Sequence, residues 1–325
     1  MGLLILGCGW IAHRHARAAY QLRRDVALMF ASRDQNRAER YRQTYGGVAA
    51  FGSYADAIAD PRVHAAVVCT PHAFHRDNAL LAASAGKHLL VEKPLARSLD
   101  EADQIIEAAE AHGVTLMVAE NFRFMPAFRR VERYVRTGWL GSLREIQLSA
   151  RGYRIPTDWR LLAAAMGGGT LIDGGIHYIT LLNQWAGDVE RVFAMSPLKS
   201  VHEIEGEDSV VLMARLAGGA VATLSNSLST PGCFATQWAT VSGAKGSLYV
   251  DNRGRFLILR SQQARRLHLY WRDRRGHTAM LKEFLSAIRE KRAPSMDGRA
   301  GRRDLGVVLA AYRSIKEERP VEVET

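Results

Sequence analysis

The sequence predicts an α/β protein in which an N-terminal doubly wound parallel sheet is followed by a C-terminal α/β domain with a large, mostly antiparallel open sheet. Over residues 1–120, short apolar runs alternate with amphipathic helical stretches, which is the pattern of βαβ units. Gly7 and Gly9 lie between the first apolar run and the first helical stretch. After residue 121, strand-like segments follow one another with turn signals between them, which is typical of an antiparallel sheet.

The first half of the chain is expected to run in strand–helix order. The predicted strands are residues 2–7, 26–32, 63–70, 88–93 and 114–120, and the predicted helices are residues 10–22, 35–46, 54–60, 74–86 and 98–113. Ser98 and Glu101 have the spacing of a capping box at the start of the last helix, and Gly113 marks its end. The strands are apolar throughout, as expected for a parallel sheet covered on both faces.

The second half is expected to hold strands at 143–152, 208–217, 220–229, 237–252 and 255–261, and helices at about 277–292 and 300–318. We therefore predict two domains. Residues 1–120 bind a dinucleotide, and residues 121–325 bind substrate and form oligomers, with the C-terminal helices packing back on the first domain.

Composition narrows the class of protein. The 325 residues are 47% hydrophobic and 24% charged, which is ordinary for a globular protein. No apolar run is long enough for a bilayer, and the first strand begins at Leu3, so we expect a cytoplasmic protein without a membrane partner. Cys8, Cys69 and Cys233 have no metal-ligand spacing, and we expect neither a metal site nor a disulfide.

The formal net charge of +11 admits two interpretations. Basic proteins bind nucleic acid, or they use a positive field to attract anionic cofactors and substrates. The basic residues are scattered, with denser segments at 266–277 and 289–303, and no nucleic-acid-binding motif accompanies them. We predict no nucleic-acid partner and interpret the dense segments as solvated surface.

The glycine loop predicts a nucleotide site. Gly7, Cys8, Gly9, Trp10, Ile11 and Ala12 match G-x-G-x-x-G/A between a strand and a helix. Gly7 permits the tight turn, Gly9 lets a pyrophosphate approach the backbone, and Ala12 lets helix and strand pack closely. The helix N-terminus supplies amide donors for the phosphates. This is the arrangement of a Rossmann domain. His13 and His15 on this helix are interpreted as surface or phosphate-proximal residues without a catalytic role.

The end of the second strand bears on the choice of cofactor. A carboxylate there hydrogen-bonds the adenosine ribose of NAD. This chain has Ser32 and Arg33, with Asp34 one residue later. A hydroxyl and a guanidinium suit a 2′-phosphate, so we predict NADP(H) over NAD(H). In the alternative, Arg33 is solvated and Asp34 reaches back to the ribose.

Two further clusters contain candidate catalytic residues. Glu92, Lys93 and Pro94 end a sheet strand, where ligands of open α/β sheets bind, and a lysine there can hydrogen-bond a reacting hydroxyl. Asp173 and His177 are spaced i,i+4, so one helix places them on one face as an acid/base pair. Two glycines between them cost a helix about 1 kcal/mol each, which indicates close approach to a ring or backbone.

These motifs, together with the segments 70–75, 85–95, 120–130, 137–146 and 167–177, resemble the glucose–fructose oxidoreductase/inositol dehydrogenase (Gfo/Idh/MocA) family. The resemblance covers roughly residues 1–185 and implies a Rossmann domain followed by an open-sheet domain that packs in homodimers or homotetramers. It implies catalysis by Lys93, Asp173 and His177, with His177 as general acid/base. It implies cofactor contacts from Gly7, Gly9, Trp10, Ile11, Ala12, Ser32, Arg33, Thr70, Pro71, His75, Glu92, Lys93, Arg123, Trp159 and Arg160.

Four residues are candidate substrate contacts: His72, Asn121, Tyr153 and Thr180. Where relatives carry a carboxylate three residues after the histidine, this chain has Thr180, which puts the usual polyol specificity in doubt. His72 stands where asparagine is frequent, and an exposed loop histidine is the alternative interpretation.

The resulting hypothesis is an NADP(H)-dependent oxidoreductase that interconverts a secondary alcohol and a ketone on a sugar, cyclitol or sugar derivative. Two other classes stay open. One is a redox-assisted glycoside hydrolase or lyase, in which the bound cofactor is oxidised and re-reduced in each turnover. The other is a cofactor-binding sensor without catalysis, against which the complete set Lys93, Asp173 and His177 argues.

Overall fold

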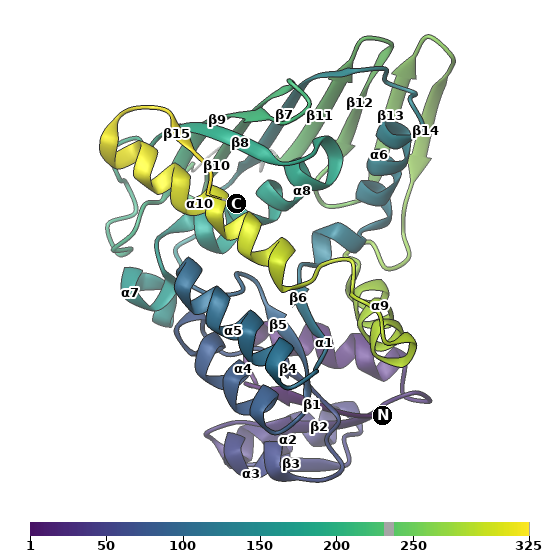
Figure 1. Ribbon diagram of the computed structural model, residues 1–325, viewed down its shortest axis with the longest axis vertical. Coiled ribbons are helices and arrows are strands. Elements are labelled where there is room, and N and C mark those ends of the chain that lie inside the picture. The colour runs from purple at the N-terminus through teal and green to yellow at the C-terminus, as the bar shows by residue number, and fades with distance from the viewer. Residues whose placement is uncertain (231–236, 325) are drawn as a thin grey trace. The chain divides into compact units, whose positions relative to one another are not determined.

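The computed structural model describes residues 1–230 and 237–324 of the chain. The chain divides into two compact units (Figure 1). The first unit consists of Met1–Glu120 and His277–Arg302, and the second begins with Asn121–Gly276 and resumes at Arg303. Cys233 lies outside the described residues, whereas Cys8 and Cys69 are buried free thiols.

The first unit is built on a six-stranded sheet of order β3-β2-β1-β4-β5-β6, and every pair of neighbouring strands is parallel. Its strands are β1 (Gly2–Leu6), β2 (Ala27–Ala31), β3 (Ala49–Phe51), β4 (Ala65–Val68), β5 (His88–Glu92) and β6 (Leu116–Ala119). The predicted doubly wound sheet is confirmed. The sequence missed β3, which has only three half-buried residues.

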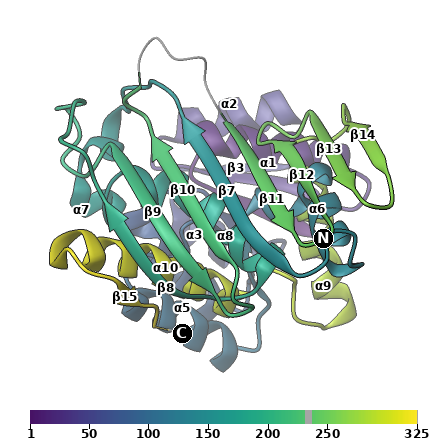
Figure 2. The ribbon, with the colours of Figure 1, turned by 90° about the horizontal axis from the view of Figure 1, so that it is seen from above.

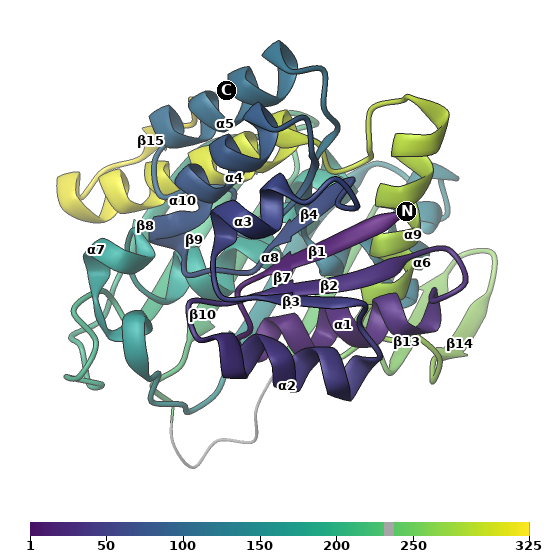
Figure 3. The ribbon, with the colours of Figure 1, turned by 90° about the horizontal axis from the view of Figure 1, so that it is seen from below.

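Helices cover both faces of this sheet. They are α1 (Trp10–Gln21), α2 (Gln35–Tyr45), α3 (Tyr54–Ala59), α4 (His75–Ser84), α5 (Leu99–Ala111) and α9 (His277–Glu290). In Figure 3, α1 and α2 lie along one face and α4 and α5 along the other, while α9 packs against α1. All five residues of β1 are buried for this reason. The Ser98 hydroxyl accepts a hydrogen bond from Glu101 N, as the capping box predicts.

The second unit is built on a nine-stranded sheet of order β14-β13-β12-β11-β7-β10-β9-β8-β15. Its strands are β7 (Leu143–Arg151), β8 (Val189–Met195), β9 (Ser209–Leu216), β10 (Val221–Ser227), β11 (Gln237–Gly243), β12 (Gly246–Asp251), β13 (Phe256–Ser261), β14 (Arg265–Leu269) and β15 (Val321–Glu322). The β7–β10 pair is parallel and the others are antiparallel. The mostly antiparallel sheet is thus confirmed, while β8, β14 and β15 were not predicted.

Helices cover one face of this larger sheet. Figure 2 shows α6 (Pro126–Arg136), α8 (Ile176–Ala186) and α10 (Gly298–Glu317) behind the sheet, with the other face uncovered by any described helix. Burial alternates accordingly along β9, where Val210, Leu212 and Ala214 are buried and Val211 and Met213 are exposed. Among the described residues, no helix combines the length and apolarity that crossing a membrane requires.

Candidate active site

The glycine loop joins β1 to α1 and leaves its backbone open to a ligand. Gly7 has φ +92°, and a Cβ there would stand 3.0 Å from the carbonyl oxygen of Cys69. A Cβ on Gly9 would meet nothing within 4 Å. The first turn of α1 has neither a side-chain cap nor an acidic residue, and the Tyr41 hydroxyl donates to Gly9 O at 2.8 Å. Uncapped amides and an open approach suit a dinucleotide pyrophosphate.

The loop after β2 contains Ser32, Arg33 and Asp34, the residues on which the predicted preference for NADP(H) rests. The Ser32 hydroxyl accepts from Asp34 N at 3.2 Å. The Asp34 carboxylate caps α2 by accepting from Arg37 N at 3.2 Å. The Arg33 guanidinium lies 5.7 Å from the ring centre of Phe74. The carboxylate that could have reached a ribose is therefore engaged by a helix.

The loop after β4 is tied to the loop after β5 by one histidine. The buried ring of His75 contacts Pro94 O at 2.8 Å and Thr70 O at 3.0 Å. Burial lowers the pKa of His75 despite these two carbonyl groups. Both ring nitrogens lie within hydrogen-bonding distance of backbone carbonyl oxygens, so the side chain holds the loop after β4 against the loop after β5. His72 is also buried, so the alternative of an exposed loop histidine is wrong.

Glu92 and Lys93 end β5 beside a histidine that the sequence interpretation had left at the surface. His15 Nε2 lies 2.7 Å from Glu92 Oε1, and both side chains are buried. Lys93 N donates to Glu92 Oε2 at 3.2 Å. Burial alone would raise the pKa of Glu92, but the hydrogen bond and charge of His15, with Lys93 and His277, hold this pKa below its usual value. The surface interpretation of His15 is wrong, because the residue shares the buried face of α1 with Ala12, Ala16 and Ala19.

Asp173 and His177 lie in the second unit, on two consecutive helical elements. Asp173 belongs to a π-helix, η4 (Leu171–Gly175), which continues into α8 with His177. The prediction of one regular helix is wrong here, and the π-helix, with its i→i+5 hydrogen bonds, is frequent at functional sites. A Cβ on Gly175 would stand 2.6 Å from Leu171 Cδ1 and 3.2 Å from Asn226 Oδ1 on β10. The close approach that the glycines indicated is thus to the side chains of Leu171 and Asn226, and the expected ring or backbone is wrong.

Each of the two side chains has a defined neighbour. The His177 ring stacks on Phe122, with centroids 4.3 Å apart and planes 13° apart. Asp173 Oδ2 accepts from Arg160 Nε at 3.3 Å and lies 3.7 Å from Arg154 Nη2. The Arg160 guanidinium lies 4.3 Å from the ring centre of Trp159. Stacking and ion pairing restrict the rotamers of both candidate catalytic groups.

The N-terminus of η4 is held by two residues that the sequence did not single out. The Tyr312 hydroxyl accepts from Gly169 N at 3.1 Å and Ile172 N at 3.2 Å, and donates to Glu207 Oε1 at 3.0 Å. Glu207 Oε1 also accepts from Leu171 N at 2.8 Å. Burial raises the pKa of Glu207 in spite of these donors. We call Tyr312 and Glu207 the η4 clamp.

Thr180 has a structural partner within the same unit. Its buried hydroxyl donates to Ile176 O at 3.2 Å and to the carboxylate of Asp304. Asn183 Nδ2 donates to Asp304 Oδ1 at 2.7 Å. A carboxylate is therefore present beside position 180, but α10 supplies it. The Thr180 hydroxyl is engaged inside the unit and not directed at a ligand.

The remaining candidates are placed as follows. Asn121 Nδ2 donates to Arg275 O at 2.8 Å. Arg123 belongs to the 3-10 helix η2 (Asn121–Phe124), and Tyr153 is exposed. The candidates thus form two groups, one in each unit. In the first unit they follow the carboxyl ends of β1, β2, β4 and β5, and in the second they lie on η2, on residues 153–160, on η4 and on α8. Among the described residues, no group of three or more His, Cys, Asp or Glu side chains could hold a metal ion.

Comparison with known proteins defines the class. Residues 1–120 match the model of the oxidoreductase family with an NAD-binding Rossmann fold, and residues 128–249 match the GFO/IDH/MocA C-terminal domain. The chain is therefore an enzyme of the oxidoreductase class with a domain for a nicotinamide dinucleotide. It belongs to the Gfo/Idh/MocA family.

Individual relatives agree with this assignment. Myo-inositol 2-dehydrogenase of Thermotoga maritima is 28% identical over 100% of this chain and 99% of its own. D-xylose 1-dehydrogenase (NADP(+)) 2 of Haloferax volcanii is 31% identical over 75% of this chain and 74% of its own. The crystal structure of GenD2 from gentamicin A biosynthesis, in complex with NAD, has a TM-score of 0.89 at 26% identity and covers 100% of this chain and 97% of that one.

Proposed function

We propose that this enzyme is an NADP(H)-dependent dehydrogenase that interconverts a secondary alcohol and a ketone on a sugar, cyclitol or sugar derivative. The observation that carries the proposal is the complete set Lys93, Asp173 and His177 in a chain with an NAD-binding Rossmann domain. Relatives named for inositol and xylose support the substrate class. Lys93 belongs to the first unit, and Asp173 and His177 belong to the second.

In oxidation, the alcohol loses a hydride from its carbinol carbon and a proton from its hydroxyl. The bound nicotinamide supplies the hydride acceptor at its C4 position. His177 takes the hydroxyl proton as general base and returns it in reduction. Stacking on Phe122 holds its ring in one plane, which lowers the entropy lost when the reacting geometry forms. Lys93 donates a hydrogen bond to the reacting oxygen, and Asp173, held by Arg160, orients the substrate.

Single substitutions test these roles. His177→Asn and Lys93→Met are expected to lower kcat on a polyol and keto-sugar panel by about 100-fold or more. His202→Asn and Lys316→Met remove the same groups from exposed positions of the second unit and serve as controls. Full turnover by both site variants contradicts the mechanism. A reaction without net change in NADPH absorbance indicates the redox-neutral hydrolase or lyase instead.

The preference for NADP(H) is supported by the loop after β2. Because Asp34 caps α2, Ser32 and Arg33 are the side chains left to meet the adenosine ribose. A guanidinium binds a phosphate with charge-assisted hydrogen bonds. Arg33→Ala is expected to raise the KM for NADPH about tenfold and to leave that for NADH unchanged. Equal KM values for both cofactors in the parent enzyme contradict the preference.

We also propose that the uncovered sheet face mediates a homodimer or homotetramer. Val211, Met213, Ile258 and Leu267 stand on this face, each between 45% and 61% exposed. They form two pairs, Val211 with Met213 on β9 and Ile258 with Leu267 across β13 and β14. Exposed apolar groups on an uncovered sheet face mark interaction surfaces. Met213→Glu is expected to shift sedimentation velocity toward the monomer, whereas Leu198→Glu, at an exposed apolar loop residue, leaves it unchanged. A monomeric parent enzyme contradicts the proposal. The cytoplasmic location and the absence of a nucleic-acid partner stay predictions.

A further inference from the structure

Two arginines converge on one carboxylate in the second unit. Arg160 Nε donates to Asp173 Oδ2 at 3.3 Å, and Arg154 Nη2 lies 3.7 Å from the same oxygen. In the described part of the chain, Asp173 is the only carboxylate within ion-pairing distance of either guanidinium. The cluster therefore carries two positive charges against one negative charge. A single arginine would be enough to orient the Asp173 carboxylate.

The two arginines differ in how far their guanidinium N–H donors remain available to a ligand. Arg160 lies against the Trp159 ring, and its side chain is 33% exposed. The side chain of Arg154 is 65% exposed, and its contact with Asp173 is too long for a hydrogen bond. A guanidinium has five N–H donors in a fixed fork. Arg154 therefore presents its donors to solvent beside a carboxylate that we assign to substrate binding.

The backbone holds Arg154 in this position. Arg154 N donates to Leu228 O at 2.9 Å, Gly152 N donates to Ser227 O at 3.0 Å, and Thr230 N donates to Gly152 O at 3.0 Å. Tyr153 forms a bridge with Ser229. The segment after β7 is thus an extension of the sheet, and the guanidinium starts from a fixed point.

We propose that the substrate is a sugar derivative carrying an oxyanion, a carboxylate or a phosphate, and that Arg154 is the residue that binds this group. The inference rests on the proposed function, since it takes Asp173 as a substrate-orienting residue. The guanidinium fork matches both oxyanions in a bidentate geometry. A neutral polyol leaves the excess positive charge of the cluster without a partner, whereas an oxyanion compensates it.

The test compares binding and turnover across three kinds of sugar. D-glucuronate carries a carboxylate, D-glucose 6-phosphate carries a phosphate, and D-glucose and myo-inositol are neutral. Binding to the full-length enzyme with saturating NADP⁺ is measured by titration calorimetry, and kcat and KM are measured in parallel. The expected result is that one oxyanion sugar binds at least about 10-fold more tightly than the neutral sugars. Which one it is identifies the oxyanion.

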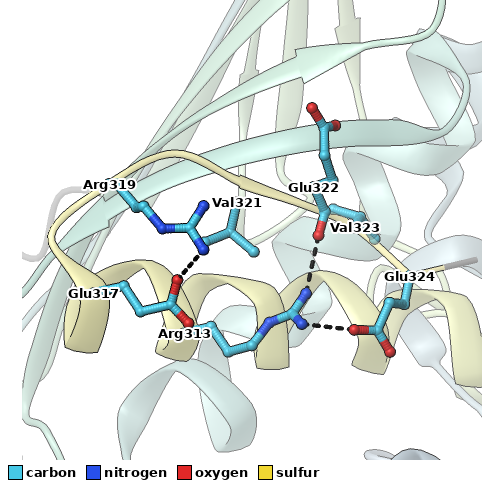
Figure 4. Close-up of a pocket in the computed structure, with 7 residues that line it drawn as sticks. All are labelled: Arg313, Glu317, Arg319, Val321, Glu322, Val323 and Glu324. Atoms are coloured by element: carbon cyan, nitrogen blue, oxygen red, sulfur yellow. Dashed lines mark hydrogen bonds and ion pairs between the residues drawn. The ribbon is translucent and has the colours of Figure 1, made fainter.

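Arg154→Gln is expected to abolish this preference by raising the Kd of the oxyanion sugar about 10- to 100-fold, while the Kd of the neutral sugars is unchanged. Arg154→Lys keeps the charge without the fork and should give an intermediate Kd. Arg319→Gln is the matched control. Arg319 also lies in the second unit and has the same 65% side-chain exposure, and it pairs with Glu317 beside a surface pocket (Figure 4).

Three results overturn the inference. They are equal binding of all the sugars by the parent enzyme, loss of the preference in Arg319→Gln as well, and equal weakening of neutral and charged sugars in Arg154→Gln. The last of these makes Arg154 a positioning residue for Asp173. Unchanged melting temperatures of the variants exclude unfolding as the cause. If no sugar is turned over but Arg154→Gln still abolishes the preference, the proposed function fails and the oxyanion site stands.

Discussion

The two units hold their candidate residues by different means. In the first unit, the loop after β2 is fixed by groups within it, since Ser32 accepts from Asp34 N and Asp34 accepts from Arg37 N. In the second unit, η4 depends on the η4 clamp, whose Tyr312 is 143 positions away from Gly169. Glycines consequently serve opposite purposes in the two regions. Gly9 leaves room for a ligand, whereas Gly168 and Gly169 leave room for the protein itself.

The sharpest test of this difference exchanges glycine for alanine in both regions. Gly168 has φ +155°, and a Cβ there would stand 2.4 Å from the Tyr312 hydroxyl oxygen. Gly168→Ala is therefore expected to lower the free energy of unfolding by about 3 kcal/mol, because it adds backbone strain to a steric clash. Urea unfolding measures the loss. Gly9→Ala meets open space and should change stability by less than about 0.5 kcal/mol.

The effects of the two variants on cofactor affinity should be reversed, with a large effect for Gly9→Ala and none for Gly168→Ala. Gly9→Ala is expected to raise the KM for NADPH about tenfold or more, because the added methyl group stands where the pyrophosphate approaches the backbone. Gly168→Ala should leave cofactor binding to the first unit intact at a temperature where the protein is folded. Equal stability losses for the two variants would remove the contrast between the regions.

The same difference explains what the sequence could and could not predict. The strand ends of the first unit were predictable because the chain reaches Ser32, Thr70 and Lys93 directly after apolar runs of the expected length. The π-helix was not, since it depends on contacts from Tyr312, Glu207 and Asn226. Nor could local sequence place Asp304 beside Thr180, 124 positions earlier. The i, i+3, i+4 and i+7 positions of Ala12, His15, Ala16 and Ala19 were a readable signal for the burial of His15.

The buried pair His15 and Glu92 gives the next largest expected effect. His15→Ala leaves Glu92 buried without its main partner, which should cost about 3 kcal/mol of stability at neutral pH. The pKa of Glu92 is lowered in the folded protein, so the contribution of the pair is present above the ordinary pKa of a glutamate and lost as the pH falls through the folded value. The penalty should therefore shrink below about pH 4.5.

His13→Ala is the matched control, because His13 lies on the same helix but is exposed and contacts Tyr45. Thermal unfolding from pH 3.5 to 8 measures both variants. A His15→Ala penalty that is constant across this range would show that packing, and not the hydrogen-bonded pair with Glu92, stabilises this part of the first unit.

The η4 clamp predicts a smaller effect that also grows with pH. Tyr312→Phe removes the acceptor of Gly169 N and Ile172 N and the donor to Glu207, at a cost of about 1–2 kcal/mol. Because burial raises the pKa of Glu207, its protonated form is favoured in the folded state at low pH. Loss of the Tyr312 donor should therefore destabilise the protein more at pH 8 than at pH 4.5.

The activity of the same variant separates positioning from mere stability. A looser η4 should lower kcat on the best sugar about tenfold and leave the KM for NADPH unchanged. Tyr20→Phe, at an exposed tyrosine of the first unit, is the control. An unchanged kcat in Tyr312→Phe would confine the clamp to a folding role.

The smallest expected effect concerns Asp34 and decides between its two interpretations. As the N-cap of α2, Asp34 should contribute about 1 kcal/mol to stability, and Asp34→Ala should lower the melting temperature by a few degrees. Its loss also removes a negative charge beside the expected 2′-phosphate, so the KM for NADPH should fall slightly and that for NADH should stay constant. If the KM for NADH rises several-fold instead, Asp34 leaves the cap to bind the ribose, and the loop after β2 is shaped by the cofactor and not by its own backbone.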